Sequence, residues 1–89
     1  MATKTIIVFG KVQGVFFRAH ARDEADRLGI TGQVCNLPDG SVHIIAEGET
    51  EAMDAFLAWC AKGPARARVD SVEVQDMEAV GYNDFSIVR

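Results

Sequence analysis

The segment Thr5-Ile-Ile-Val-Phe-Gly-Lys-Val-Gln-Gly-Val-Phe-Phe-Arg18 joins an apolar stretch to a run that carries two glycines and one arginine. From Thr5 to Gly10 the residues are β-branched or apolar, so a strand here would be apolar on both faces. Such a strand is typical of the centre of a sheet rather than of its edge. The segment therefore predicts a central strand that leads directly into a glycine-containing loop and a helix.

The loop from Gly10 to Arg18 has the features of an anion-binding site. Gly10 and Gly14 allow positive φ and close backbone approach, so successive N–H groups can form a concave nest of donors. The following helix adds its positive dipole end and its unpaired first-turn N–H groups. Arg18 adds a planar fork of donors that matches two oxygens of a phosphate or carboxylate. The glycine spacing fits neither a Walker A loop nor the G-x-G-x-x-G dinucleotide fingerprint.

Two helices are predicted from apolar periodicity. The first begins at the loop and ends at Gly29, which is the predicted left-handed cap. Thr50 is the predicted N-cap of the second helix, with acidic residues in the first turn. The apolar stripes of the two helices are Phe17, Ala21, Ala25 and Leu28 in the first, and Met53, Phe56, Leu57 and Cys60 in the second.

The remaining apolar segments alternate as strands do. Strands at 31–36 and 41–47 are joined by a Pro-Asp-Gly turn and predict a hairpin. Further strands are predicted at 69–75, with Val72 and Val74 facing inward, and at 85–88. The order βαββαβ plus a short C-terminal strand predicts an α+β, ferredoxin-like fold, with an antiparallel sheet and two helices on one face.

Composition limits the class of protein. A chain of 89 residues with 48% hydrophobic content predicts a single domain, 1–89. The net charge of −4 argues against a nucleic-acid partner, which would need a basic face. The N-terminus shows no targeting segment and no run reaches membrane-spanning length, so we expect a cytoplasmic protein with no membrane partner. Cys35 and Cys60 lack metal-ligand spacing and are expected to be unpaired, with Cys60 in the core.

Two ordered motifs resemble those of the acylphosphatase family. Residues 10–18 match the pattern G-x-V-Q-G-V-x-F-R at every fixed position. A second pattern, G-x-V-x-N-x-x-D-G-x-V, is matched by Gly32, Val34, Asn36, Asp39, Gly40 and Val42. The resemblance covers essentially the whole chain and implies the ferredoxin-like fold. It also implies an enzyme, a small acylphosphate phosphohydrolase that converts an acyl phosphate and water to a carboxylate and inorganic phosphate.

The resemblance implies a role for each motif residue. Arg18 and Asn36 would be catalytic, with Arg18 clamping the phosphoryl group and Asn36 orienting the attacking water. The backbone of the loop would bind the substrate, through Gln13, Gly14, Val15, Phe16, Phe17 and Arg18. No covalent intermediate, cofactor or metal is implied. Inorganic phosphate or sulfate would compete for the same site, and the protein is expected to be a monomer.

Other interpretations apply to the same residues. Asn36 could cap the turn that follows it rather than hold a water. Arg18 could be solvated, although an arginine at the positive end of a helix is unfavourable without an anion beside it. A non-catalytic anion-binding or regulatory domain of the same fold is the main functional alternative. An RNA-binding module of the RRM type is excluded, because the aromatic strand motif and basic face that it needs are missing.

Overall fold

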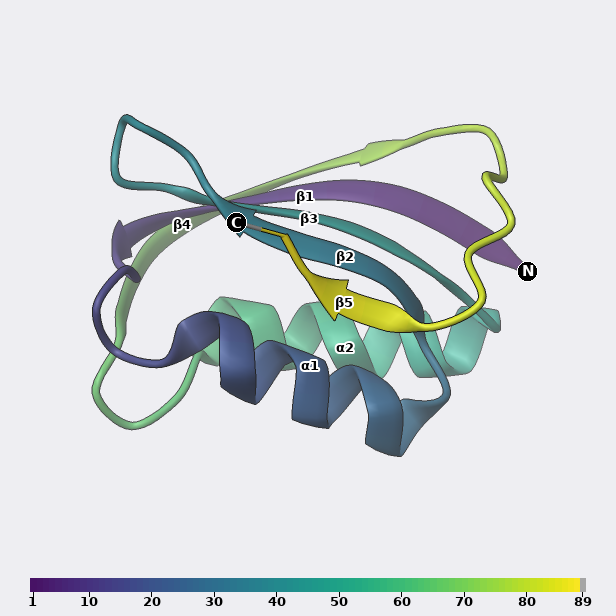
Figure 1. Ribbon diagram of the computed structural model, residues 1–89, viewed down its shortest axis with the longest axis horizontal. Helices are drawn as coiled ribbons and strands as arrows, with labels where there is room; N and C mark the ends of the chain where they lie inside the picture. The colour runs from purple at the N-terminus through teal and green to yellow at the C-terminus, as the bar shows by residue number, and fades with distance from the viewer. Residues whose placement is uncertain (89) are drawn as a thin grey trace.

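The computed structural model describes residues 1–88 as a five-stranded sheet and two helices (Figure 1). The elements are β1 (Ala2–Lys11), α1 (Phe17–Leu28), β2 (Thr31–Asn36), β3 (Val42–Gly48), α2 (Thr50–Lys62), β4 (Arg68–Asp76) and β5 (Phe85–Ile87). Arg89, the last residue of the predicted domain, lies outside the described residues. Neither helix in this part of the chain has the length and apolar character needed to cross a membrane.

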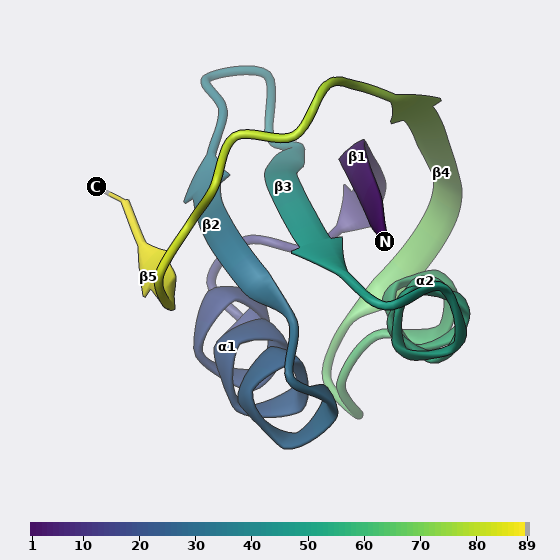
Figure 2. The ribbon, with the colours of Figure 1, turned by 90° about the vertical axis from the view of Figure 1, so that its right-hand side faces the viewer.

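The strand that precedes the loop is central, as predicted. In the sheet order β4-β1-β3-β2-β5, β1 pairs antiparallel with both β3 and β4. Ile6 and Val8 of β1 are fully buried. Both helices cover the same face of the sheet (Figure 2). The predicted ferredoxin-like arrangement is therefore confirmed.

The last strand differs from the prediction of a wholly antiparallel sheet. β5 pairs parallel with β2, in the register Gly32↔Phe85 to Val34↔Ile87. The reason is the path of residues 77–84, which leave the end of β4 and cross the end of the sheet over β1 and β3 (Figure 2). The chain consequently enters β5 from the same end as β2, and the sheet is mixed.

The core lies between the sheet and the two helices. Its helical side comprises Phe17, Ala21 and Ala25 of α1 with Met53, Phe56 and Cys60 of α2. Small alanines let α1 lie close to the sheet, while aromatic side chains fill the space beside α2. Burial raises the pKa of the Cys60 thiol to about 12. Cys35 is half-buried, and both cysteines are free, as predicted.

Two local predictions need correction and one is confirmed. Thr50 is the first residue of α2 rather than its N-cap; Glu49 is the N-cap and its side chain makes no capping hydrogen bond. Val74 is 41% exposed, because β4 is an edge strand that the helices cover only in part. Gly29 ends α1 in the left-handed conformation (φ 73°), and its N–H donates to the carbonyl groups of Ala25 and Asp26, as expected of the cap.

Candidate active site

The loop that follows β1 depends on unusual backbone conformations. The β1–β4 pairing shifts register between Phe9 and Gly10. A Cβ added to Gly10 (φ 130°) would lie 2.1 Å from the carbonyl oxygen of Arg68, so no other residue fits there. Phe16 is left-handed (φ 61°) and is the one non-glycine residue with positive φ among residues 1–88. That conformation costs roughly 1 kcal/mol, so the surrounding structure must hold the loop in place.

The N-terminus of α1 has no internal anion to balance its dipole. Its N-cap, Phe16, makes no side-chain cap, and the first turn contains no acidic residue. The first helical hydrogen bond runs from the His20 N–H to the Phe16 carbonyl, at 3.0 Å. The preceding N–H groups lack helical partners. Arg18 occurs in this first turn, and none of the ion pairs found among residues 1–88 involves it.

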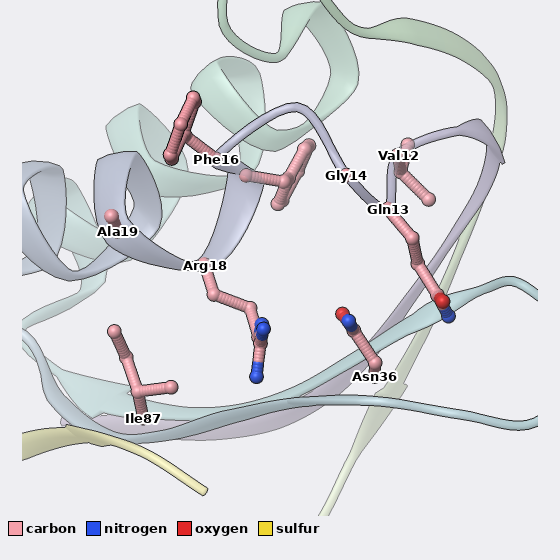
Figure 3. Close-up of a pocket in the computed structure, with 9 residues that line it drawn as sticks. Val12, Gln13, Gly14, Phe16, Arg18, Ala19, Asn36 and Ile87 are labelled. Atoms are coloured by element: carbon pink, nitrogen blue, oxygen red, sulfur yellow. The ribbon is translucent and has the colours of Figure 1, made fainter. Parts of the chain in front are cut away.

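A pocket of about 440 Å³ lies beside this loop. Figure 3 shows the Arg18 guanidinium and the Asn36 amide turned toward the same space, one from α1 and one from the end of β2. The other lining residues are Val12, Gln13, Gly14, Phe16, Phe17, Ala19 and Ile87. The structure therefore brings the two predicted catalytic residues together, although 18 positions separate them in the sequence.

Val15 is the predicted loop residue that does not line this pocket. Its side chain is buried in the core. Ile87 lines the pocket from β5 and was missed, because its place depends on the parallel β2–β5 pairing that the sequence pattern did not reveal.

The Asn36 side chain does not cap the turn. Its Oδ1 is buried and has no hydrogen-bond partner among residues 1–88. The turn is held by other groups: the Gly40 N–H donates to the Leu37 carbonyl at 3.1 Å, and the Ser41 N–H donates to Asp39 Oδ1 at 2.9 Å. The hydroxyl and N–H of Ser41 also lower the pKa of the Asp39 carboxyl.

The Gln13 side chain links the loop to that turn. Its Nε2 donates to the carbonyl groups of Leu37 and Ser41, each at 2.8 Å. The predicted role of Gln13 concerned only its backbone, and no short-range pattern points to this side-chain contact. The amide fixes the loop that carries Arg18 relative to the hairpin that carries Asn36.

Comparison with known proteins identifies the family. The acylphosphatase family model matches residues 4–87. The acylphosphatase of Methylococcus capsulatus is 48% identical over 85 residues, which cover 94% of this chain and 92% of that protein. The crystal structure of the Bacillus subtilis acylphosphatase superposes with a TM-score of 0.96 at 38% identity and covers 100% of both chains. An acylphosphatase structure from Coxiella burnetii gives a TM-score of 0.94 at 37% identity, over 98% of this chain and 92% of that chain.

The chain belongs to the acylphosphatase family. The predicted family, the predicted enzyme class and the predicted fold are confirmed by these similarities. The roles assigned to individual residues of the pocket stay predictions.

Proposed function

We propose that this acylphosphatase hydrolyses acyl phosphates by direct attack of water on phosphorus. One observation carries the proposal: Asn36 lines the same pocket as Arg18, and its Oδ1 is a buried acceptor without a partner among residues 1–88. An unpaired buried acceptor costs roughly 1–3 kcal/mol. A rotation of the Asn36 amide toward the pocket would let a water donate to Oδ1, which would remove that cost and place the water beside whatever Arg18 binds.

The loop and Arg18 would hold the phosphoryl group. Backbone N–H groups from Gln13 to Arg18 supply donors in a nest, and the uncompensated N-terminus of α1 adds positive potential. Arg18 would contact two phosphoryl oxygens through its fork of donors. These groups would neutralise charge on the phosphoryl oxygens as the transition state forms, with no cofactor and no metal.

The reaction balances with water and substrate alone. The water oxygen forms a bond to phosphorus while the bond between phosphorus and the bridging carboxylate oxygen breaks. The carboxylate leaves with the electron pair of that bond, and a water proton passes to a phosphoryl oxygen. Asn36 would orient the water, because an amide accepts and donates hydrogen bonds without acting as a strong base.

Hydrolysis of benzoyl phosphate in ¹⁸O-labelled water tests this mechanism. We expect the label in inorganic phosphate and none in benzoate, because attack occurs at phosphorus. Label in benzoate would mean attack at the carbonyl carbon and would overturn the proposal. Binding of inorganic phosphate without any turnover of benzoyl phosphate would favour the non-catalytic alternative.

The cellular compartment, the oligomeric state and the domain extent of the enzyme stay predictions. We expect a cytoplasmic monomer formed by one domain, 1–89. Sedimentation at several protein concentrations would test the oligomeric state. A mass that rises with concentration would contradict the monomer.

A further inference from the structure

A second pocket adjoins the phosphate-binding loop. It has a volume of about 390 Å³ and lies between the first turn of α1, the last turn of α2 and the connection from residue 63 to residue 66. Figure 1 shows the β1–α1 loop and the α2–β4 connection at the same end of the molecule. Phe16 lines both this pocket and the one that contains Arg18 and Asn36. The two pockets are therefore neighbours on either side of one residue.

The second pocket is lined by two aromatic side chains, Phe16 and Trp59. Trp59 packs against Phe17 and Phe56, with ring centroids 5.2 Å and 6.2 Å apart. Phe16 is 67% exposed, although it is a large apolar side chain on a strained backbone. An exposed phenylalanine at a left-handed position has no evident use in the core. Together with Trp59 it offers an apolar surface to a ligand that extends from the loop.

The same pocket is positively charged. Lys62 and Arg66 line it, and neither takes part in an ion pair found among residues 1–88. The protein as a whole has a net charge of −4, so this is a local exception to its average charge. Unpaired cations beside aromatic walls suit a ligand that has an apolar body and an anionic end.

Reaction geometry directs the acyl group toward this pocket. The attacking and leaving oxygens of a phosphoryl transfer are roughly in line, on opposite sides of phosphorus. In Figure 3, Asn36, which would hold the water, lies on one side of the pocket and Phe16 lies on the opposite side of the loop. The leaving carboxylate, with the acyl group attached, would therefore point toward Phe16 and the pocket behind it.

We infer that the pocket between Phe16, Trp59, Lys62 and Arg66 is an acyl subsite. It favours acyl phosphates whose acyl group is aromatic or extended and ends in a carboxylate or another anionic group. The inference rests on the proposed function, because it uses the position of the attacking water.

Two substrates that differ only in a distal charge test the subsite. The kcat/KM for 4-carboxybenzoyl phosphate should exceed that for benzoyl phosphate by about five-fold, the scale of two exposed charge contacts. The double variant Lys62→Gln/Arg66→Gln should bring this ratio close to one. A ratio of one or less in the unmodified enzyme, or an unchanged ratio in the double variant, would overturn the inference. Lack of turnover with either substrate would instead refute the proposed function.

A matched variant distinguishes an effect of the pocket cations from an effect of the protein's overall charge. Arg22 is an exposed cation of α1 outside both pockets, so Arg22→Gln removes one positive charge elsewhere. This variant should keep the five-fold preference. An equal loss of preference in Arg22→Gln and in Lys62→Gln would show that the overall field, and not the pocket, selects the substrate.

Trp59 gives a readout that does not depend on turnover. It is the single tryptophan of the chain and lines this pocket, so the protein's tryptophan fluorescence comes from the wall of the subsite. Phenacylphosphonate, which has a methylene group in place of the bridging oxygen, cannot be hydrolysed as an acyl phosphate. Its binding should change the Trp59 emission, whereas inorganic phosphate at equal saturation should change it much less. Equal changes with both ligands, or none with phenacylphosphonate, would place the acyl group elsewhere.

Discussion

The protein contains two backbone sites suited to an anion, one already filled and one open. The filled site surrounds Glu47, a residue that is 2% exposed and whose carboxylate accepts hydrogen bonds from the N–H groups of Val80, Gly81 and Tyr82 at 2.8, 2.9 and 3.1 Å. The Thr3 hydroxyl donates a fourth at 2.8 Å. The open site is the loop from Gln13 to Arg18, which has no carboxylate of its own.

The difference shows what each site is for. The Glu47 carboxylate fixes the connection between β4 and β5 across the sheet, so the role of this anion is structural. In the loop, Arg18 replaces the acidic residue that helix α1 would prefer, and Asn36 Oδ1 stays unpaired. Groups that would be satisfied in a purely structural site are left free there. We therefore expect the filled site to contribute stability and the open site to contribute binding and catalysis.

Removal of Arg18 should have the largest effect. Arg18→Ala should lower kcat/KM by roughly 10³-fold, as when a guanidinium leaves a phosphoryl-transfer site, and should weaken competitive inhibition by inorganic phosphate. Arg18→Lys keeps the charge but loses the fork, so it should recover little activity. Thermal stability should hardly change, because this arginine is unfavourable at a helix N-terminus without its anion. Full activity in Arg18→Lys would show that point charge suffices.

Asn36→Ala should reduce kcat by ~10²-fold, the scale of losing one oriented polar group. The inhibition constant of inorganic phosphate should stay close to its original value, because the water and not the phosphoryl group depends on Asn36. Steady-state kinetics with and without phosphate measures both quantities. A variant that kept kcat and lost phosphate affinity would assign Asn36 to binding.

Mutation of the filled site should lower stability rather than activity. Glu47→Gln should lower Tm by about 10 °C, since a buried amide cannot accept from four donors as a carboxylate does. It should leave kcat/KM almost unchanged below Tm. The Val80 N–H, the Thr3 hydroxyl and the other backbone donors lower the pKa of Glu47. Its stabilising contribution is therefore complete above the ordinary glutamate pKa and is lost as pH falls through the lowered value.

Thermal melts from pH 7 to pH 3 would check this sign. The Tm difference between the original protein and Glu47→Gln should be constant near neutral pH and should shrink in acid. A difference that grew as pH fell would contradict the assignment of the charged form as the stabilising one.

The smallest expected effect comes from filling the open site. Inorganic phosphate at about three times its Kd should raise Tm by about 4 °C, because a ligand that binds only the folded state stabilises it by mass action. Arg18→Ala should lose most of this rise, while Glu47→Gln should retain it. An equal rise in Arg18→Ala would place the bound phosphate outside the loop.

Prediction from sequence succeeded where the signal was local. The apolar run of β1, the Gly29 cap and the hairpin turn are each encoded within a few residues. The loop with Arg18 was recognisable for the same reason. Asn36 was identified through its motif, and its placement opposite Arg18 follows from the pairing of β2 with β3 and of β3 with β1.

Apart from the N-cap of α2, which was predicted at Thr50 and lies at Glu49, the missed features are non-local. Glu47 lies on the sheet face that the helices leave uncovered, and its burial depends on the connection that crosses there. The parallel entry of β5, and with it the place of Ile87, depends on the same connection. The Gln13 side chain finds its acceptors 24 and 28 residues further along the chain. No periodicity or turn signal reports contacts of this kind.

The hydrogen bonds of Gln13 also bear on how activity appears during refolding. Helices and a local hairpin can form in microseconds, whereas the pairing of β1 with β3 and β4 must first close long loops, which slows folding. Arg18 and Asn36 face one another only after those strands have paired and the Gln13 amide has reached the turn. We therefore expect activity to return late in refolding, with the native sheet rather than with early helical structure.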